Sequence, residues 1–280
     1  HSNMGRETHL MPVIWENQIV RWQQVSKTKW EPVRYLFPVV APETGKVERI
    51  NPLPFTDKHQ FYNDTFNDNF DAKQLAPDWV FRRVPQPNTF SLNANKGHLR
   101  LYLKPEAFQP RKRYSAMGIT QKESEFEWEV KMKFKPKKNL EEAGISVYQK
   151  DINFVNLTVQ KIGNEHFVKV TVKEKNNQVT AMTDSAKIPN TEVKAFKSKA
   201  LPNYAGEILL KIASKNGKYL YFFSTDGGAS YQKLAETPDN IVLGMMYTGA
   251  NVGIYATSNG QKTTGYADFD WVNYKGFVKY

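Results

Sequence analysis

The chain has 280 residues, of which 40% are hydrophobic and 13% aromatic, enough to bury the core of one large domain or two ordinary ones. Charges of both signs are mixed along it and no apolar run is long enough to span a bilayer, so we expect no membrane segment. Lysine and arginine outnumber aspartate and glutamate by 39 to 28, but no nucleic-acid motif accompanies them, and we expect no nucleic-acid partner. The absence of cysteine excludes disulfides, zinc thiolate sites and cysteine nucleophiles.

The first forty residues contain too few strand signals to close a domain. A short apolar run covers Leu10–Trp15, and an extended, proline-punctuated stretch covers Trp30–Pro42. So few strands cannot form a core, so we expect residues 1–40 to be the end of a larger domain. Proline, glycine, glutamate and lysine then dominate, which predicts a linker over residues 41–58 and a second domain over 59–280.

The second domain has an all-β pattern. In Glu125–Pro136 the apolar side chains alternate with glutamates and lysines, which predicts a strand with one face in the core and one in water. The alternation also places Phe269 and Trp271 on the core face of the last strand. Asn176-Asn177, Asn216-Gly217 and Asp226-Gly227 suit tight turns, because these residues tolerate positive φ.

About a dozen antiparallel strands are expected, and they predict two sheets packed face to face as a sandwich. Besides Glu125–Pro136, the predicted strands are Trp79–Arg83, His98–Lys104, Gly144–Gln149, Asn153–Gln160, His166–Lys173, Gln178–Thr183, Ile208–Ala213, Tyr219–Ser224, Val252–Ala256 and Tyr266–Tyr274.

Several short stretches, in this order, resemble glycoside hydrolase family 43, in its β-xylosidase and α-L-arabinofuranosidase branch. Gly5-Arg6-Glu7-Thr8, with the following Leu10–Trp15, resembles the motif that closes the five-bladed catalytic propeller of that family. The matches to its C-terminal concanavalin A-like sandwich are Phe66–Trp79, Glu142–Ile145, Ser224–Gly228, Tyr247–Ala250 with Val252-Gly253, and Ala267–Trp271.

The resemblance implies an all-β chain: the terminal strands of a five-bladed propeller, followed by a concanavalin A-like, or lectin-like, two-sheet sandwich. It implies inverting hydrolysis of β-xylosides or α-L-arabinofuranosides of plant polysaccharide by the parent enzyme. Inversion sets the acid and base about 6.5–9.5 Å apart to admit a water. In the family the two aspartates and one glutamate that carry the reaction lie in earlier blades, so we expect this chain alone to be inactive and to hold no catalytic residue.

Arg6 is the first residue to which the resemblance assigns a role. The arginine of the matching motif reaches the floor of the active site and hydrogen-bonds sugar hydroxyls, work that suits a fixed, permanently charged fork of donors. The alternative is an ordinary exposed pair with Glu7, which contributes little.

Phe108 is the second. It is the phenylalanine of the polar, proline-broken loop Pro105–Tyr114, and in related enzymes a sandwich loop carries an aromatic side chain across the domain interface to wall off the sugar pocket. Such a ring excludes water and stacks on the apolar face of a pyranose. The alternative is a phenylalanine buried under its own loop.

Two groups of carboxylates complete the candidates. Asp68, Asp268 and Asp270 are candidates for a structural Ca²⁺ that ties the first and last strands together, against the alternative of solvated side chains; no cofactor is expected for catalysis. Glu125, Glu127 and Glu129 lie roughly 6.6–6.8 Å apart along one strand face, which offers a rival enzyme reading. Because a general acid needs burial to raise its pKa, the favoured interpretation is a solvated face.

The leading hypothesis is therefore a portion of a family 43 glycosidase whose sandwich buttresses the propeller and lends a loop to its active site. The alternative is a non-catalytic carbohydrate-binding module for xylan or arabinan, and a weaker one is a purely structural domain. We expect an oligosaccharide substrate, the remainder of the propeller and a homo-oligomer as partners. A periplasmic or extracellular location is expected, with the cytoplasm as the alternative.

Overall fold

The computed structural model describes residues 11–47, 64–109, 111–173, 194–242 and 248–277. Contacts divide the chain into two units, each described here by itself: one contains the hairpin of the first two strands, the other all remaining elements. The described helical content is one 3₁₀ turn, η1 (Asp239–Val242). No helix in the described part of the chain is long and apolar enough to cross a bilayer.

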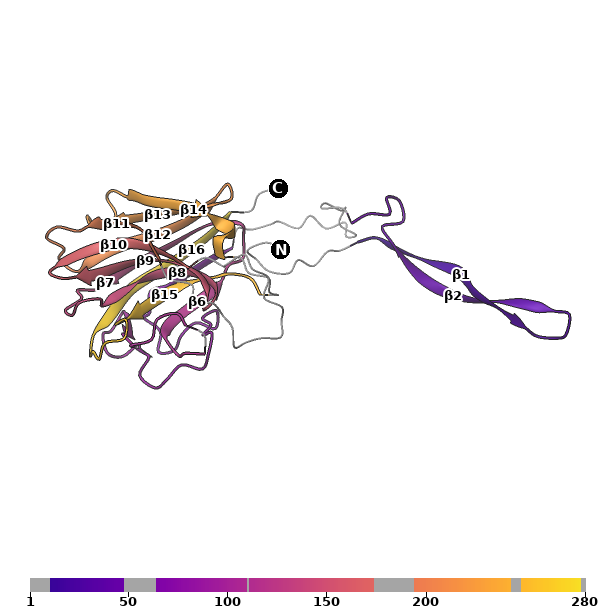
Figure 1. Ribbon diagram of the computed structural model, residues 1–280, viewed down its shortest axis with the longest axis horizontal. Coiled ribbons are helices and arrows are strands. Elements are labelled where there is room, and N and C mark those ends of the chain that lie inside the picture. Colours follow the sequence, from indigo (N-terminus) through magenta and orange to yellow (C-terminus); the bar gives the residue numbers. More distant parts are fainter. Residues whose placement is uncertain (1–10, 48–63, 110, 174–193, 243–247, 278–280) are drawn as a thin grey trace. The chain divides into compact units, whose positions relative to one another are not determined.

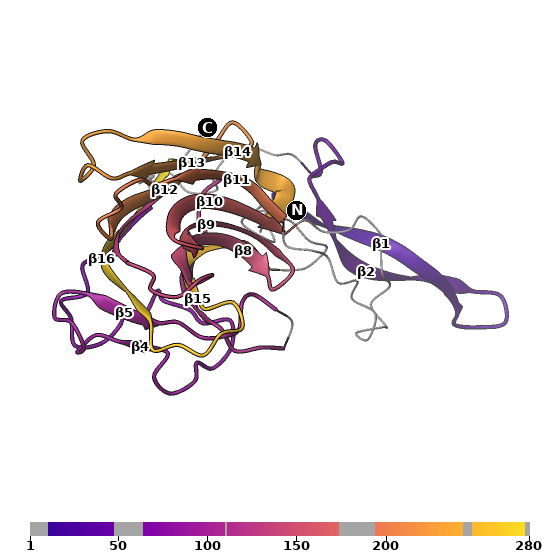
Figure 2. The same ribbon diagram turned by 60° about the vertical axis from the view of Figure 1, so that its left-hand side comes forward.

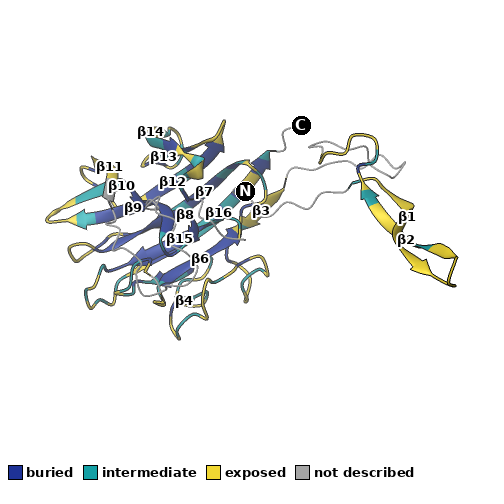
Figure 3. Ribbon diagram, turned by 45° about the vertical axis from the view of Figure 1, so that its right-hand side comes forward, coloured by how far each residue is buried: buried dark blue, intermediate teal, exposed yellow. Residues whose placement is uncertain are grey.

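The hairpin pairs β1 (Val13–Gln24) with β2 (Trp30–Val40) along almost their full length, with one irregularity between Ile19 and Arg21. β1 extends well beyond the short apolar run Leu10–Trp15, whereas β2 lies within the extended stretch Trp30–Pro42. β2 tolerates Pro32 and Pro38 because both strands are edge strands, where a missing N–H need not break a ladder. The hairpin is coloured almost wholly as exposed in Figure 3. A two-stranded sheet has no second layer that could cover its apolar side chains.

The other unit is a sandwich of two antiparallel sheets, as the sequence predicts (Figure 1). One sheet has six strands in the order β11-β10-β9-β8-β15-β6, and the other has eight, in the order β14-β13-β12-β7-β16-β5-β4 with β3 paired to β16. In Figure 2, β8, β9 and β10 curve beneath the layer that contains β12, β13 and β14.

The strands of the two sheets have the following bounds. The six-stranded sheet contains β6 (Ser115–Thr120), β8 (Glu142–Lys150), β9 (Asn153–Ile162), β10 (Glu165–Lys173), β11 (Lys194–Ala200) and β15 (Asn251–Thr257). The eight-stranded sheet contains β3 (Thr65–Asp68), β4 (Phe90–Ser91), β5 (Leu99–Tyr102), β7 (Glu125–Lys133), β12 (Glu207–Lys215), β13 (Lys218–Ser224), β14 (Gln232–Pro238) and β16 (Tyr266–Phe277).

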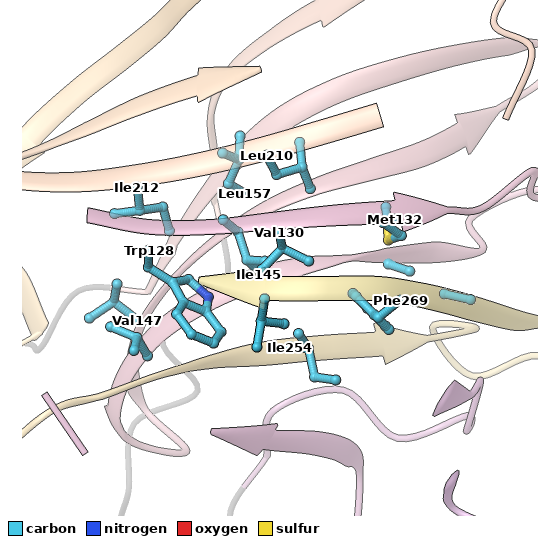
Figure 4. Close-up of a cluster of buried hydrophobic side chains, with 14 of the residues drawn as sticks. Trp128, Val130, Met132, Ile145, Val147, Leu157, Leu210, Ile212, Ile254 and Phe269 are labelled. Atoms are coloured by element: carbon cyan, nitrogen blue, oxygen red, sulfur yellow. The ribbon is translucent and has the colours of Figure 1, made fainter. Parts of the chain in front are cut away.

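The core lies between the sheets, where alternate side chains of both layers interdigitate (Figure 4). β7 contributes Trp128, Val130 and Met132, all fully buried as their alternation predicts. The Trp128 indole N–H also donates a hydrogen bond of 3.2 Å to the carbonyl of Gly253 on β15, so it joins the two sheets. Burial of this large ring, together with its satisfied N–H, makes β7 the centre of the sandwich.

Two sequence predictions differ from the structure, and a third falls outside the described residues. Trp79–Arg83 is not a strand; Val80 forms an isolated bridge to Gly118 and the segment is otherwise irregular, with a bend at Arg82 and Arg83. Trp271 does not face the core, because the pairing with β7 shifts between Phe269 and Trp271. The extra residue restarts the alternation at Val272 and leaves Trp271 only half-buried. The predicted strand Gln178–Thr183 and the turn Asn176-Asn177 lie outside the described residues.

The predicted turn Asn216-Gly217 is confirmed. It joins β12 to β13, and both residues have positive φ, 52° and 72°. Positive φ at both central positions is the geometry that matches the twist of a two-residue hairpin.

Candidate functional site

The outward face of the six-stranded sheet is polar and nearly sealed from solvent. Cross-strand pairing places Gly253, Ser146, Asn156 and Thr171 in one row across β15, β8, β9 and β10. The Ser146 hydroxyl donates to Asn156 Oδ1 at 2.7 Å, and both residues are at most 2% exposed. The three side chains of this row are polar although they lie away from water, an arrangement that costs free energy unless every group finds a partner.

Three side chains of this sheet, Asn153, Thr171 and His166, have a buried polar atom without a hydrogen-bond partner among the described residues. For Asn153 and Thr171, which are 1% and 5% exposed, the atoms are Nδ2 and Oγ1. Nearby on β10, burial lowers the pKa of Lys173, an effect that Asp151 partly offsets. Unsatisfied buried groups of this kind mark places where ordered water or another molecule completes the structure.

Glu142 is the buried carboxylate of this face. Its Oε1 accepts a hydrogen bond from Thr158 at 2.9 Å, and its Oε2 accepts from Gln160 and Asn259 at 3.1 Å each. The Lys169 ammonium lies 3.0 Å from the same Oε2. Four donors surround the carboxylate, three at Oε2 and one at Oε1, so Glu142 links β8, β9 and β10.

A second buried carboxylate, Asp151, anchors the loops at the end of the sheet. Arg82 Nε lies 2.7 Å from its Oδ1 and Arg83 Nη2 3.3 Å from its Oδ2. The Tyr114 hydroxyl donates to Oδ1 at 2.6 Å. Burial, with the hydrogen bond to Asp151 second, raises the pKa of Tyr114 well above its ordinary value. Tyr114 is therefore a neutral donor that holds the end of the Pro105–Tyr114 loop in place.

Phe108 lies at the centre of an aromatic cluster on this face. Its ring stacks on Tyr255 with centroids 4.6 Å apart and planes 8° apart, and also contacts Tyr114, Tyr148 and Phe154. Phe108 is 1% exposed, so in this structure it packs under its own loop, the alternative that the sequence left open. To wall off a sugar across an interface, the ring would have to leave this cluster. Its role as a lid stays a prediction.

The three candidate calcium ligands each have a separate partner. Asp68 accepts from the Trp79 indole at 2.8 Å, Asp268 pairs with Arg100 at 2.7 Å, and Asp270 with Lys131 at 3.0 Å. No group of three or more histidine and carboxylate side chains in the described residues could hold a metal ion. In the described segments, these three aspartates therefore do not come together as a set of Ca²⁺ ligands.

Glu125, Glu127 and Glu129 point outward from β7, as predicted, but they are half-buried instead of fully solvated. Burial raises the pKa of Glu129, Lys211 acts against that shift and Glu127 adds to it. The Tyr231 hydroxyl also donates a hydrogen bond to Glu129. Glu129 thus has the raised pKa that the rival enzyme hypothesis requires. Among the described residues, however, no second acid faces it across a cleft.

Arg6, the remaining candidate, lies outside the described residues. The polar face of the six-stranded sheet, which the structure reveals, had only an indirect signal in the sequence. Ser146, Asn156, Thr158 and Gln160 interrupt strands that otherwise read as core. Their alternation with Val155, Leu157 and Val159 predicts a two-faced sheet, but not that the polar face is buried.

Comparison with known proteins places the chain in a family. Residues 67–275 match the family described as "Beta xylosidase C-terminal Concanavalin A-like domain". A non-reducing end α-L-arabinofuranosidase of Bacteroides ovatus, BoGH43B, is 30% identical over 277 residues, which are 98% of this chain and 46% of that protein. A xylosidase/arabinosidase of Butyrivibrio fibrisolvens is 26% identical over 271 residues, 96% of this chain and 46% of the relative.

Solved structures of other proteins show the same fold. The structure titled "Bacteroides ovatus Xyloglucan PUL GH43B" matches with a TM-score of 0.71 at 26% identity, over 89% of this chain and 47% of that one. A xylan β-1,4-xylosidase from Bacillus halodurans shares the fold, with a TM-score of 0.70 at 20% identity over 88% and 47% of the two chains. The chain spans just under half the length of the curated relatives it matches. By the match over residues 67–275, this chain belongs to the family of β-xylosidase C-terminal concanavalin A-like domains.

Proposed function

We propose that this chain is the C-terminal portion of a family 43 glycoside hydrolase that acts on β-xylosides or α-L-arabinofuranosides of plant polysaccharide with inversion. The observation that carries the proposal is the extent of the match: 98% of this chain aligns with 46% of an arabinofuranosidase. The sandwich would support the catalytic propeller and lend a loop to its sugar pocket. The catalytic aspartates and glutamate would belong to the propeller, so this chain alone would be inactive.

The β1–β2 hairpin supports the propeller part of this proposal. It carries large apolar side chains with high exposure, among them Trp15 at 65%, Trp22 at 57% and Leu36 at 63%. Several large apolar side chains exposed together on one hairpin support the proposal that another structure covers it. We assign residues 1–40 to the terminal strands of the propeller, 41–58 to a linker and 59–280 to the sandwich, with Arg6 contacting the sugar. A periplasmic or extracellular location and a homo-oligomer belong to the same proposal.

The alternative, an independent carbohydrate-binding module, receives less support. A surface that captures a polysaccharide presents a row of exposed aromatic rings, on which sugar rings stack. In the described part of the sandwich, the large hydrophobic side chains with high exposure include only two aromatic ones, Phe196 and Tyr266, and these lie on different sheets. Two separated rings do not make a row.

The test is hydrolysis of nitrophenyl β-xyloside and nitrophenyl α-L-arabinofuranoside. The 280-residue chain is assayed alone and beside a polypeptide extended at its N-terminus to include a whole propeller. We expect activity in the extended polypeptide only, and a loss of that activity in its Arg6→Ala variant. Activity in the short chain would overturn the proposal and direct attention to Glu129 and its neighbours on β7.

A further inference from the structure

A pocket of about 490 Å³ lies at one end of the eight-stranded sheet, apart from the polar face of the six-stranded sheet. It is bounded by the end of β7 and the loop that follows, by the turn before β12, and by the segment from Thr263 into β16. The pocket lies in the size range of small-ligand sites, about 300–1,000 Å³. These three segments are far apart in the sequence and meet only in the folded sandwich.

Four lysines line the pocket: Lys133, Lys135, Lys137 and Lys138, all of them exposed. Within the described segments, none of these ammonium groups forms an ion pair with a carboxylate. Lys133 Nζ lies 3.3 Å from His98 Nε2, and Lys138 Nζ donates to the carbonyl of Lys262 at 2.8 Å. The sequence predicts Lys133 and Lys135 as the solvated face of a strand, but the fold gathers them with two further lysines around one hollow.

The carboxylates on the pocket wall do not neutralise this charge. Asp268 takes two hydrogen bonds from the Arg100 guanidinium, at 2.7 and 2.8 Å. Glu207 lies 3.6 Å from Lys131, a lysine outside the pocket lining. Two of the three acids of the wall therefore already have cationic partners.

The third acid, Glu141, is held by the loop itself. Its Oε2 accepts the backbone N–H groups of Lys137 and Lys138 at 2.7 and 3.0 Å, and its Oε1 accepts the Thr263 hydroxyl at 2.5 Å. These bonds fix the two loop lysines on a rigid frame beside the 263–265 segment. The pocket wall thus carries four ammonium groups without an ion pair in the described segments, against one carboxylate, Glu141, without a cationic partner, and this excess of positive charge attracts an anion.

The other wall residues suit a sugar better than a nucleic acid. Thr264 and the backbone around Gly206 supply small polar groups, and Tyr266, 44% exposed, stands at the edge with its ring held by Arg100 at 3.6 Å from the ring centroid. Binding of single-stranded nucleic acid uses several successive aromatic platforms along a groove, and Tyr266 is the one aromatic side chain with high exposure among the described residues of the pocket wall.

We propose that this pocket binds a uronate-bearing oligosaccharide. The sugar carboxylate lies among Lys135, Lys137 and Lys138, and a sugar ring packs at Tyr266. Ammonium groups are donors to carboxylates and hydroxyls alike, so the same wall holds the charged group and its neighbouring hydroxyls. This site is independent of hydrolysis: it lies wholly on this chain, and its binding is measured without any catalytic residue.

The test is isothermal titration calorimetry of the full 280-residue chain with two probes of equal length, trigalacturonate and xylotriose. We expect trigalacturonate to bind at least tenfold more tightly, and its affinity to fall between about 0.05 and 0.3 M salt because exposed charges are screened. The Lys135→Ala/Lys137→Ala variant is expected to lose at least tenfold in affinity. The matched control is Lys197→Ala/Lys215→Ala, which removes two exposed lysines outside the pocket and is expected to bind as the parent does.

Three results would overturn the proposal. Equal affinity for the two trisaccharides would show that the lysines do not select the carboxylate. An equal loss in the two double variants would show that only net charge matters. Displacement of trigalacturonate by a short single-stranded DNA that binds more tightly would assign the pocket to nucleic acid. Melting curves of both variants confirm that each is folded, so a loss of binding is not a loss of structure.

Discussion

Arg100 and Asp268 face each other on β5 and β16 and form a two-pronged ion pair, with Arg100 Nε 2.7 Å from Oδ1 and Nη2 2.8 Å from Oδ2. Asn95 donates a further hydrogen bond of 3.0 Å to Oδ2. The pair is shielded, because the side chains are only 18% and 9% exposed. Asp268 is also a candidate calcium ligand. It therefore has two possible roles to test: an ion pair between two strands, or a metal ligand.

The first prediction measures how much this ion pair stabilises the fold. Asp268→Asn keeps the shape but removes the charge, and we expect the free energy of unfolding to fall by about 1.5–3 kcal/mol, the range for hydrogen bonds to charged groups. The exposed pair Lys29 and Glu31 supplies the control, and Glu31→Gln is expected to change stability by less than about 1 kcal/mol. Urea unfolding measures both.

For the calcium prediction, the expected result is that a chelator leaves the melting temperature of the parent chain unchanged. Asp68, Asp268 and Asp270 each have a protein partner, so removal of Ca²⁺ takes nothing from the fold. A lower melting temperature in chelator, restored by added Ca²⁺ and not by Mg²⁺, would establish the metal site instead.

Phe108 tests whether the loop is a lid or a packed corner. Phe108→Ala removes a ring that is 1% exposed and stacked on Tyr255, so we expect a loss of about 3–5 kcal/mol in unfolding free energy, as for other buried aromatic side chains. Phe196, 53% exposed on β11, is the matched control, and Phe196→Ala is expected to be nearly neutral. Unchanged stability of Phe108→Ala, with weaker xyloside binding in the extended enzyme, would support the lid.

How far the sequence reaches is clear from β7 and β16. Strict alternation in β7 predicts its buried face correctly, because every second side chain enters one core. The same rule fails at Trp271, because a bulge depends on the partner strand and leaves no mark in the alternation before it. The lysine pocket was equally out of reach: Lys133 and Lys135 read as solvent-facing, and Thr263–Tyr266 complete the wall only through tertiary pairing.

Glu142 and Lys169 offer a test of coupling on the polar face. Their side chains are only 6% and 12% exposed and lie 3.0 Å apart, so either Glu142→Gln or Lys169→Met leaves the other charge buried without its ionic partner. We expect each single change to cost about 3–5 kcal/mol, and the double variant to cost clearly less than the sum. A double-mutant cycle by urea unfolding measures the coupling. Additive losses would show that the two side chains stabilise the sheet independently.

The last prediction concerns alkaline pH. Burial raises the pKa of Tyr148 and of Tyr255 above the ordinary value. In the unfolded chain both phenols ionise near pH 10, whereas in the fold they stay neutral, so above that pH the native state binds more protons. Stability from this source is complete below about pH 10 and is lost as the pH rises towards the folded-state pKa values, by up to about 1.4 kcal/mol per pH unit for each phenol.

Unfolding free energies measured from about pH 8 to pH 11.5 check this slope, with tyrosinate absorbance as the direct readout of ionisation. Tyr148→Phe removes one buried phenol and is expected to make the alkaline decline shallower. Tyr35→Phe, at a position 56% exposed on β2, is the control and is expected to leave the slope as it is. The lowered pKa of Lys173 acts in the opposite direction. Its contribution to the stability of the fold increases as the pH rises towards the pKa of lysine in the unfolded chain. An alkaline limb that is equally steep in Tyr148→Phe and in the parent would show that the Tyr148 phenol ionises freely in the fold.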